Sequence, residues 1–378
     1  MPTPVRVRVD ACPGVLAPHD AADGALARVR LPGGQVDAAA LWVLAACAED
    51  LGDGKIHLTS RGNLQLRGLD RSDPELERRL TGCGLLPSRT HERVRNVLAS
   101  PLSGIAGGLA DVRELAPALD RALCARPELA GLSGRFLFAL DDGRGDVAAE
   151  QPDLCWQALD AATGTLVVAG TETGVTARTE DAVALLVRAA TTFLQVRGSA
   201  WRAIELPEAD RARLAGPSAP TRGAIRPDSR VLPSRLAGVG PVRRADGGTA
   251  LAVAPVLGEL TAAQLLVLAD AAQRVVVTPW RSIVLPTADA AARLAAAGLV
   301  VDPASPAPLL SACAGRPGCA KALADVRADA RTALPLIHRR THVSGCERRC
   351  GAPHAPHVDA VALADGGYLI DGERQDGL

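Results

Sequence analysis

The sequence predicts an α+β fold in which one α/β unit occurs twice along the chain. Residues 34–48 (GQVDAAALWVLAACA) and 258–272 (GELTAAQLLVLADAA) are both Ala/Leu-rich and helical in pattern. A segment rich in β-branched residues follows each helix, and a Pro-, Gly- and Ser-rich stretch separates the two copies. Because matching elements recur in the same order, duplication explains the pattern better than chance.

Each copy has a strand before its helix and strands after it. In the first copy, ALARVRLPGG ends on a Pro-Gly-Gly turn, Asp37 is the expected N-cap, and strands begin at Ile56. In the second copy, ALAVAPVLG precedes the expected N-cap Thr261, and strands begin at Val275. A threonine and then an arginine lie between the strands of each pair: Thr59 and Arg61, and Thr278 and Arg281.

A larger mixed segment follows each copy. Residues 91–210 combine strands (RFLFALDD, TLVVAGT) with a helix (EDAVALLVRAATTFLQV), and residues 300–378 carry a cysteine cluster and a hairpin-like tail. The predicted boundaries are 1–90 and 236–298 for the two repeated half-domains, 91–213 and 299–378 for the two mixed α/β domains, and 214–235 for the linker.

The composition excludes several classes of protein. Lys+Arg and Asp+Glu both number 42, so bulk charge gives no indication of nucleic-acid binding. No apolar run approaches the roughly 18 residues that span a bilayer, and the N-terminus lacks the pattern of a secretory signal. We therefore expect a soluble, cytoplasmic protein that binds neither nucleic acid nor membrane.

Four of the nine cysteines form two close pairs. SACAGRPGCAKAL places Cys313 and Cys319 six positions apart, and THVSGCERRCGAP places Cys346 and Cys350 four apart. Four thiolates suit tetrahedral zinc or an iron–sulfur cube, but structural zinc sites favour shorter spacings than these. The pattern favours a 4Fe-4S cluster over four unrelated buried cysteines. The remaining five cysteines are isolated and receive no role.

Together these motifs resemble those of the sulfite and nitrite reductase superfamily. The two cysteine pairs, with Gly345 before the second, are similar to its cluster motif, and Thr59, Arg61, Asn63 and Gln65 to its strand motif. Arg95, Asn96 and Val97 match its Arg-Asn-Val element. The resemblance implies two ferredoxin-like half-domains plus two mixed α/β domains with pseudo-twofold symmetry. It also implies siroheme beside the cluster in the reductases, bridged by the residue that corresponds to Cys350.

One departure argues against reduction of sulfite or nitrite. Where the reductases have paired lysines, this chain has Arg135 and then Leu137, which removes part of the positive charge that a small oxyanion needs. Several segments instead resemble precorrin-3B synthases of the same superfamily: DACPGVLAPHDAADGALARVRLPGG, RFLFALDDG and VTPWRSIVLP. This resemblance implies O2-dependent hydroxylation and lactone formation on precorrin-3A in aerobic cobalamin biosynthesis.

A precorrin carries many carboxylates, and arginine forks bind such groups well. The residues expected to bind the tetrapyrrole are Arg61, Asn63, Gln65, Arg67, Arg95, Arg135 and Arg281. Arg67 alternates with apolar neighbours, so a solvated strand face explains it equally well. A siroheme-dependent sulfite or nitrite reductase remains the alternative, and a protein that only transfers electrons is a third hypothesis.

The resemblance to precorrin-3B synthases also implies a mononuclear non-haem iron. His354, His357 and Asp359 in the tail HAPHVD could supply a two-histidine, one-carboxylate set, but a solvated loop is the simpler interpretation. No Gly-x-Gly-x-x-Gly motif follows a strand. Electrons from NADH would therefore arrive through a partner reductase or an electron-donor protein.

Overall fold

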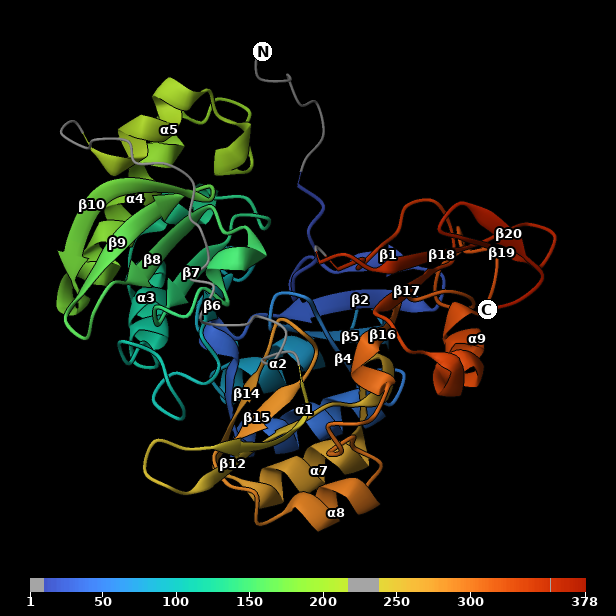
Figure 1. Cartoon of the computed structure of the whole chain (residues 1–378). Coiled ribbons are helices and arrows are strands. Elements are labelled where there is room, and N and C mark those ends of the chain that lie inside the picture. The colour runs from blue at the N-terminus through green and yellow to red at the C-terminus, as the bar shows by residue number, and fades with distance from the viewer. Residues whose placement is uncertain (1–9, 217–237, 354) are drawn as a thin grey trace.

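The computed structural model describes residues 10–216, 238–353 and 355–378. Within them the strands form four five-stranded sheets, two of which belong to the repeated units (Figure 1). The predicted α+β architecture with duplicated halves is confirmed. Of the predicted linker 214–235, residues 214–215 end helix α5 (Glu208–Ala215), and 217–235 lie outside the described residues. The domain boundaries stay a prediction.

The two repeated units exchange one strand each. The first sheet has the order β1 (His19–Ala21), β2 (Gly24–Val29), β5 (Leu64–Leu69), β4 (Lys55–Leu58) and β13 (Glu259–Thr261). The second has the order β11 (Gly240–Arg243), β12 (Thr249–Val253), β15 (Ile283–Leu285), β14 (Arg274–Val277) and β3 (Gln35–Asp37). Strand β13 of the second unit thus closes the first sheet, and β3 of the first unit closes the second.

The predicted helices of the two copies pack against one another. Helix α1 (Ala38–Leu51) and helix α7 (Ala262–Ala271) contribute to one hydrophobic core that both sheets share. Helix α2 (Glu75–Gly82) and helix α8 (Ala291–Ala296) lie beside them. Because the core is common to both units, neither unit has a complete core of its own.

The expected N-caps behave differently in the two copies. Thr261 forms a full capping box, since its Oγ1 accepts from Gln264 N at 3.2 Å and its own N donates to Gln264 Oε1 at 3.0 Å. Asp37 precedes α1, but its side chain makes no cap bond and instead accepts from Arg274 Nε at 2.6 Å. Asp37 therefore occupies the predicted N-cap position, but its carboxylate pairs with Arg274 and does not cap the helix.

The two mixed domains have the same strand pattern. The third sheet has the order β10 (Thr171–Arg178), β9 (Thr163–Val168), β8 (Leu154–Ala158), β7 (Phe138–Asp141) and β6 (Val97–Ala99). The fourth has the order β16 (Leu310–Ala312), β17 (Thr341–Ser344), β18 (Val358–Ala362), β19 (Tyr368–Ile370) and β20 (Glu373–Gln375). In each, three parallel strands are followed by two antiparallel ones.

Helices cover these outer sheets. Helix α3 (Leu115–Cys124), helix α4 (Ala182–Val196) and α5 pack on the third sheet, and α9 (Val326–Ala333) packs on the fourth. In Figure 1 these two domains lie on opposite sides of the central pair of repeated units. In the described part of the chain, every helix is too short or too polar to cross a membrane.

Glu259 joins three parts of the fold. It lies on the exchanged strand β13 directly opposite His57 of β4, and its side chain is only 8% exposed. Its carboxylate pairs with Arg327 of α9 at 2.9 Å and also with Arg331. Lys55 of β4 approaches the same carboxylate at 3.9 Å. One buried charge thus links the two repeated units to the C-terminal domain.

We predict that Glu259→Gln lowers the free energy of unfolding by about 3 kcal/mol, because the partly buried Arg327 guanidinium loses its counter-charge. Urea denaturation of the full chain measures this. Glu180→Gln removes an exposed carboxylate that pairs with Arg178 and should leave the unfolding free energy nearly unchanged. Equal effects of the two substitutions would contradict the importance of the Glu259 contacts.

Candidate metal centre and ligand cleft

The four predicted cluster cysteines lie on two adjacent loops. Cys313 directly follows β16, and Cys346 lies two residues after the end of the neighbouring parallel strand β17. The backbone N–H of Gly345 donates to Cys313 Sγ at 3.2 Å. Parallel strands deliver their carboxyl ends to one edge, so these loops meet there. All four cysteines, including Cys319 and Cys350, border one cavity.

The cysteine sulfurs are not gathered as closely as in a closed zinc site. Tetrahedral zinc bound at about 2.3 Å holds its thiolates about 3.8 Å apart. Among the described residues, only Asp141, Asp142 and Asp146 place three such ligating atoms within 4.8 Å of one another. No three of the cysteine sulfurs therefore lie within 4.8 Å of one another. Burial and then the other three cysteines raise the pKa of Cys350.

The cavity beside the cysteines has a volume of about 570 Å³ and opens onto the first sheet. This size is typical of a ligand site. Its charged lining is mostly basic and includes Arg28, Arg67, Arg281, Lys321, Arg327 and Arg348. His57 and Gln65 also border it. The cavity is therefore a positively charged cleft with the cysteine loops along one side.

Two predicted ligand-binding arginines already have carboxylate partners. Arg67 pairs with Asp23 through Nε and Nη2, both at 2.9 Å, and Nη2 also donates to Gly318 O at 2.6 Å. Arg95 is 3% exposed, pairs with Asp120 at 2.6 and 2.7 Å, and does not border the cavity.

This geometry does not support the binding role predicted for Arg95, because its buried guanidinium would have to leave Asp120 uncompensated. Arg67 borders the cavity, but its contacts indicate a different role. It holds the loop between Cys313 and Cys319 against the first sheet. The solvated strand face considered for Arg67 is also wrong, since the residue is 6% exposed.

The Thr59–Asn63 turn between β4 and β5 determines which of the other predicted residues reach the cavity. Thr59 Oγ1 accepts from Arg61 N at 3.3 Å and from Asn63 N at 3.1 Å. Asn63 is 1% exposed and its Oδ1 accepts from Leu31 N at 2.9 Å, so it stabilises the turn and does not reach the cavity. The binding role predicted for Asn63 is not supported. Gln65 does border the cavity.

Arg61 and Arg135 lie together beside the first mixed domain, outside the lining of the cavity. Arg61 Nη1 donates to Arg135 O at 3.0 Å, and the Arg135 guanidinium lies 5.1 Å from the centre of the Trp201 ring. Burial and then the nearby Arg202 lower the pKa of Arg61 to about 10. Their binding roles stay a prediction.

Sequence reasoning missed Arg28 and Arg30. Arg28 borders the cavity, donates from Nη2 to Gln65 Oε1 at 3.3 Å, and within the described residues forms no salt bridge. Arg30, 2% exposed, donates to Pro13 O at 3.2 Å. Burial lowers the pKa of Arg28 and takes that of Arg30 to about 9. Arg28 on β2 and Arg30 just beyond its end are two positions apart in an otherwise apolar segment. This alternation indicates that both side chains lie on one face.

Arg281 takes the position of a glycine in the other copy. In the Thr278–Ser282 turn, Trp280 corresponds to Arg61, and Arg281 (φ 59°) corresponds to Gly62 (φ 60°). The expected equivalence of Arg61 and Arg281 is therefore wrong by one residue. A left-handed arginine is strained, and such strain concentrates at functional positions. Arg281 Nη2 donates to Gly351 O at 2.9 Å, beside Cys350.

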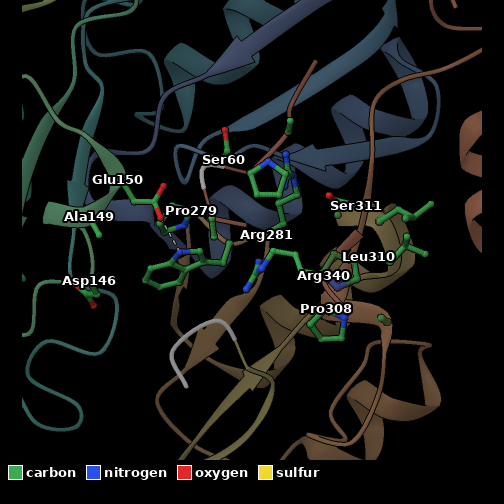
Figure 2. Close-up of a pocket in the computed structure, with 18 of the residues that line it drawn as sticks. Ser60, Asp146, Ala149, Glu150, Pro279, Arg281, Pro308, Leu310, Ser311 and Arg340 are labelled. Atoms are coloured by element: carbon green, nitrogen blue, oxygen red, sulfur yellow. Dashed lines mark hydrogen bonds between the residues drawn. The ribbon is translucent and has the colours of Figure 1, made fainter. Parts of the chain in front are cut away.

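Arg281 also borders a second cavity of about 520 Å³ (Figure 2). The Trp280 indole there donates from Nε1 to Glu150 Oε1 at 2.9 Å, as the dashed line in Figure 2 marks. Ser311 and Arg340 come from the C-terminal domain, and Ser60 borders both cavities. Burial lowers the pKa of Arg281.

The three buried aspartates, Asp141, Asp142 and Asp146, have hydrogen-bond partners within their own loop. Asp141 accepts from the backbone N–H groups of Gly143, Gly145 and Ala148, and Arg144 forms a bidentate pair with Asp142. Burial, and then the charge of Asp141, raise the pKa of Asp146 to about 8. A guanidinium and a retained proton therefore compensate much of the charge, and the geometry does not require a cation.

The tail histidines do not form a converging metal site with the described residues. His357 Nδ1 lies 2.9 Å from Ala355 O, and Asp359 Oδ2 accepts from Arg349 Nε at 2.5 Å. His354 lies outside the described residues. Burial and then Arg281 lower the pKa of His342, whose ring centre is 6.1 Å from that of His357, to about 4.

Comparisons with known proteins agree with this arrangement. Residues 19–81 match the nitrite/sulfite reductase ferredoxin-like half domain. The whole chain is 29% identical to a precorrin-3B synthase of Sinorhizobium sp, of which it covers 85%. Over 35% of the chain it is 37% identical to a ferredoxin–nitrite reductase of Synechococcus elongatus, covering 27% of that protein.

A solved structure shows the same fold. The NirA protein of Mycobacterium tuberculosis superposes on 92% of this chain and 74% of its own, with a TM-score of 0.72 and 21% identity. The matched half-domain lies in the first repeated unit, and the full-length relative extends the similarity through both cysteine loops. The chain therefore has the fold of the NirA protein, and its sequence is similar to a precorrin-3B synthase over its whole length and to a ferredoxin–nitrite reductase over part of it.

Proposed function

We propose that the chain is a precorrin-3B synthase, a cytoplasmic monooxygenase that hydroxylates precorrin-3A and forms a lactone on it. The observation that carries this proposal is the placement of four cysteines along a basic cleft. The relative named precorrin-3B synthase matches the whole chain, whereas the nitrite reductase from Synechococcus matches about a third of it. That difference in coverage favours the synthase.

The cleft suits a substrate that is both broad and polyanionic. Arg28 and Arg281 form no salt bridge within the described residues, so their guanidinium groups can bind substrate carboxylates without breaking an ion pair. Lys321 adds a further positive charge at the cysteine loops. Apolar atoms of Leu26 and Leu58 can contact the face of the macrocycle.

In this proposal the cysteines hold a 4Fe-4S cluster, which supplies electrons one at a time. Hydroxylation places one oxygen atom of O2 in the product, and two electrons and two protons convert the other to water. NADH is the electron source, through an electron-donor protein or reductase. The described residues offer no converging two-histidine, one-carboxylate set, so no step is assigned to a mononuclear iron.

A siroheme-dependent reductase of sulfite or nitrite is the second candidate. The cysteines beside a basic cleft favour it, as does the similarity to ferredoxin–nitrite reductases. Leu137 opposes it, because this side chain is 2% exposed and packs in an apolar cluster where the reductases present a lysine. Siroheme that copurifies with the chain and gives a strong Soret band would favour this candidate.

We predict that the cluster-loaded protein converts precorrin-3A with O2 and a reductant. Mass spectrometry with ¹⁸O2 should find one labelled oxygen in the product, because a monooxygenase retains one atom of O2. An identical reaction without O2 is the control. An unlabelled product, or no conversion by protein with full iron and sulfide content, would reject the proposed function.

We predict that Cys346→Ser abolishes the cluster, because a serine oxygen replaces one of its four thiolates. Iron and sulfide analysis after anaerobic reconstitution, with the EPR spectrum, measures this. Cys124→Ser is the matched control, since Cys124 ends α3 in the other mixed domain. Unchanged iron content in Cys346→Ser would show that the ligand assignment is wrong.

We predict that Arg28→Gln weakens binding of the octacarboxylate uroporphyrin, a stable probe, about tenfold by removing one charged hydrogen-bond donor from the cleft. Fluorescence titration gives the Kd. Arg178→Gln, which changes an exposed arginine of the third sheet, should leave the Kd unchanged. Arg95→Gln should lower stability without a comparable change in the Kd, and a tenfold loss there would contradict the structural role assigned to Arg95.

A further inference from the structure

The duplicated mixed domains provide an internal comparison for the cysteine loops. Their parallel strands have matching registers: Val97 pairs with Phe138, and Phe138 with Leu154, as Leu310 pairs with Thr341, and Thr341 with Val358. Counting from these pairs, Ser100 corresponds to Cys313, Gly143 to Cys346 and Val147 to Cys350. Each position near the cysteines therefore has a counterpart in a domain without them.

One sheet face differs sharply between the two domains. Residues paired in register across neighbouring strands lie on the same face. In the first domain, Leu98, Ala139 and Cys155 are so paired and form a buried apolar cluster with Val147. In the C-terminal domain the corresponding row is Ser311, His342 and Asp359. The fold alone is thus satisfied by apolar residues at these positions.

The polar row lies against the second cysteine loop. Asp359 Oδ2 accepts from Arg349 Nε, which precedes Cys350. A β-carbon at Gly351 would lie 4.0 Å from His342 Cε1, which places the imidazole beside the backbone that follows Cys350. The row therefore supports Cys350, the most exposed of the four predicted ligands.

His342 has one ring nitrogen to spare for this loop. The side chain is 0% exposed, Nδ1 lies 2.8 Å from Ser311 Oγ, and Nε2 has no hydrogen-bond partner among the described residues. The Ser311 hydroxyl also lies 3.4 Å from Thr341 O, but its contact with Nδ1 is much shorter. When the hydroxyl donates its one hydrogen to Nδ1, the ring hydrogen is on Nε2. A buried N–H without a hydrogen-bond partner costs free energy. A group that accepts a hydrogen bond from this N–H would therefore stabilise the protein.

We propose that His342 is a positioning residue for Cys350. Ser311 orients the imidazole, and Nε2–H is directed at the Cys350 loop, where it fixes the outermost thiolate and stabilises added negative charge on the cluster. The inference rests on the proposed cluster and assigns no part of the reaction to His342. The apolar counterparts in the first domain explain why the fold does not require this residue.

The test uses His342→Ala, which introduces the residue found at the corresponding position of the first domain. After anaerobic reconstitution, EPR-monitored titration should give a more negative midpoint potential, because a donor near the thiolate is lost. Iron release to a chelator should be about tenfold faster, as is typical when such supporting contacts are removed. His342→Gln keeps an N–H donor and should recover part of both effects. Ser311→Ala should shift the potential in the same direction by less.

The matched control is His91→Ala in the first mixed domain. His91 is 2% exposed and bonds to Ser88 Oγ at 2.9 Å and to Arg126 O at 3.0 Å, so it is a comparable buried histidine far from the cysteines in the fold. It should leave the potential and iron release unchanged.

A cluster in His342→Ala with wild-type potential and wild-type iron release would overturn the role of His342 alone. If His342→Ala does not fold, the same result in Ser311→Ala would overturn it. A wild-type chain that takes up no iron and sulfide would instead overturn the cysteine assignment and the proposed function.

Discussion

The buried carboxylate of Glu259 and strand β13 connect the two repeated units to each other and to the C-terminal domain. Strand β13 completes the first sheet while belonging to the second repeated unit, and the same carboxylate reaches Arg327 of the C-terminal domain. The Arg327 guanidinium in turn donates from Nε to Cys313 O at 3.0 Å. The position of the first cysteine loop therefore depends on a contact made at the junction of the two repeated units.

Much of the fold and the cysteine site can be predicted from the sequence, because their signals are local. Periodicity gives the helices, and Cys313 and Cys346 each lie close to a second cysteine in the chain. The exchange of β3 and β13 has no such signal. A three-residue strand looks the same whichever sheet it joins, and its partner is set by packing of residues far apart in sequence.

The arginines also show that contacts between residues far apart in the sequence cannot be predicted from local patterns. The sequence predicts ligand binding by Arg67 and Arg95, yet Asp23 and Asp120 occupy their guanidinium groups. Among the residues that the structure describes, Arg28 has no such partner, and it borders the cleft. Which arginine is available for a ligand depends on the distribution of acidic partners in space, and motif matching does not contain that information. Comparison of the two duplicated domains does contain part of it, since a residue that differs between equivalent positions is not required by the fold.

The left-handed backbone of Arg281 couples the two cavities. The side chain borders both, and its hydrogen bond to Gly351 O fixes it beside the cysteine loop. An anion in the second cavity that attracts this guanidinium takes it away from the cleft, and a carboxylate in the cleft does the reverse. The two cavities therefore share a single positive charge at their boundary, within reach of an anionic group in either one.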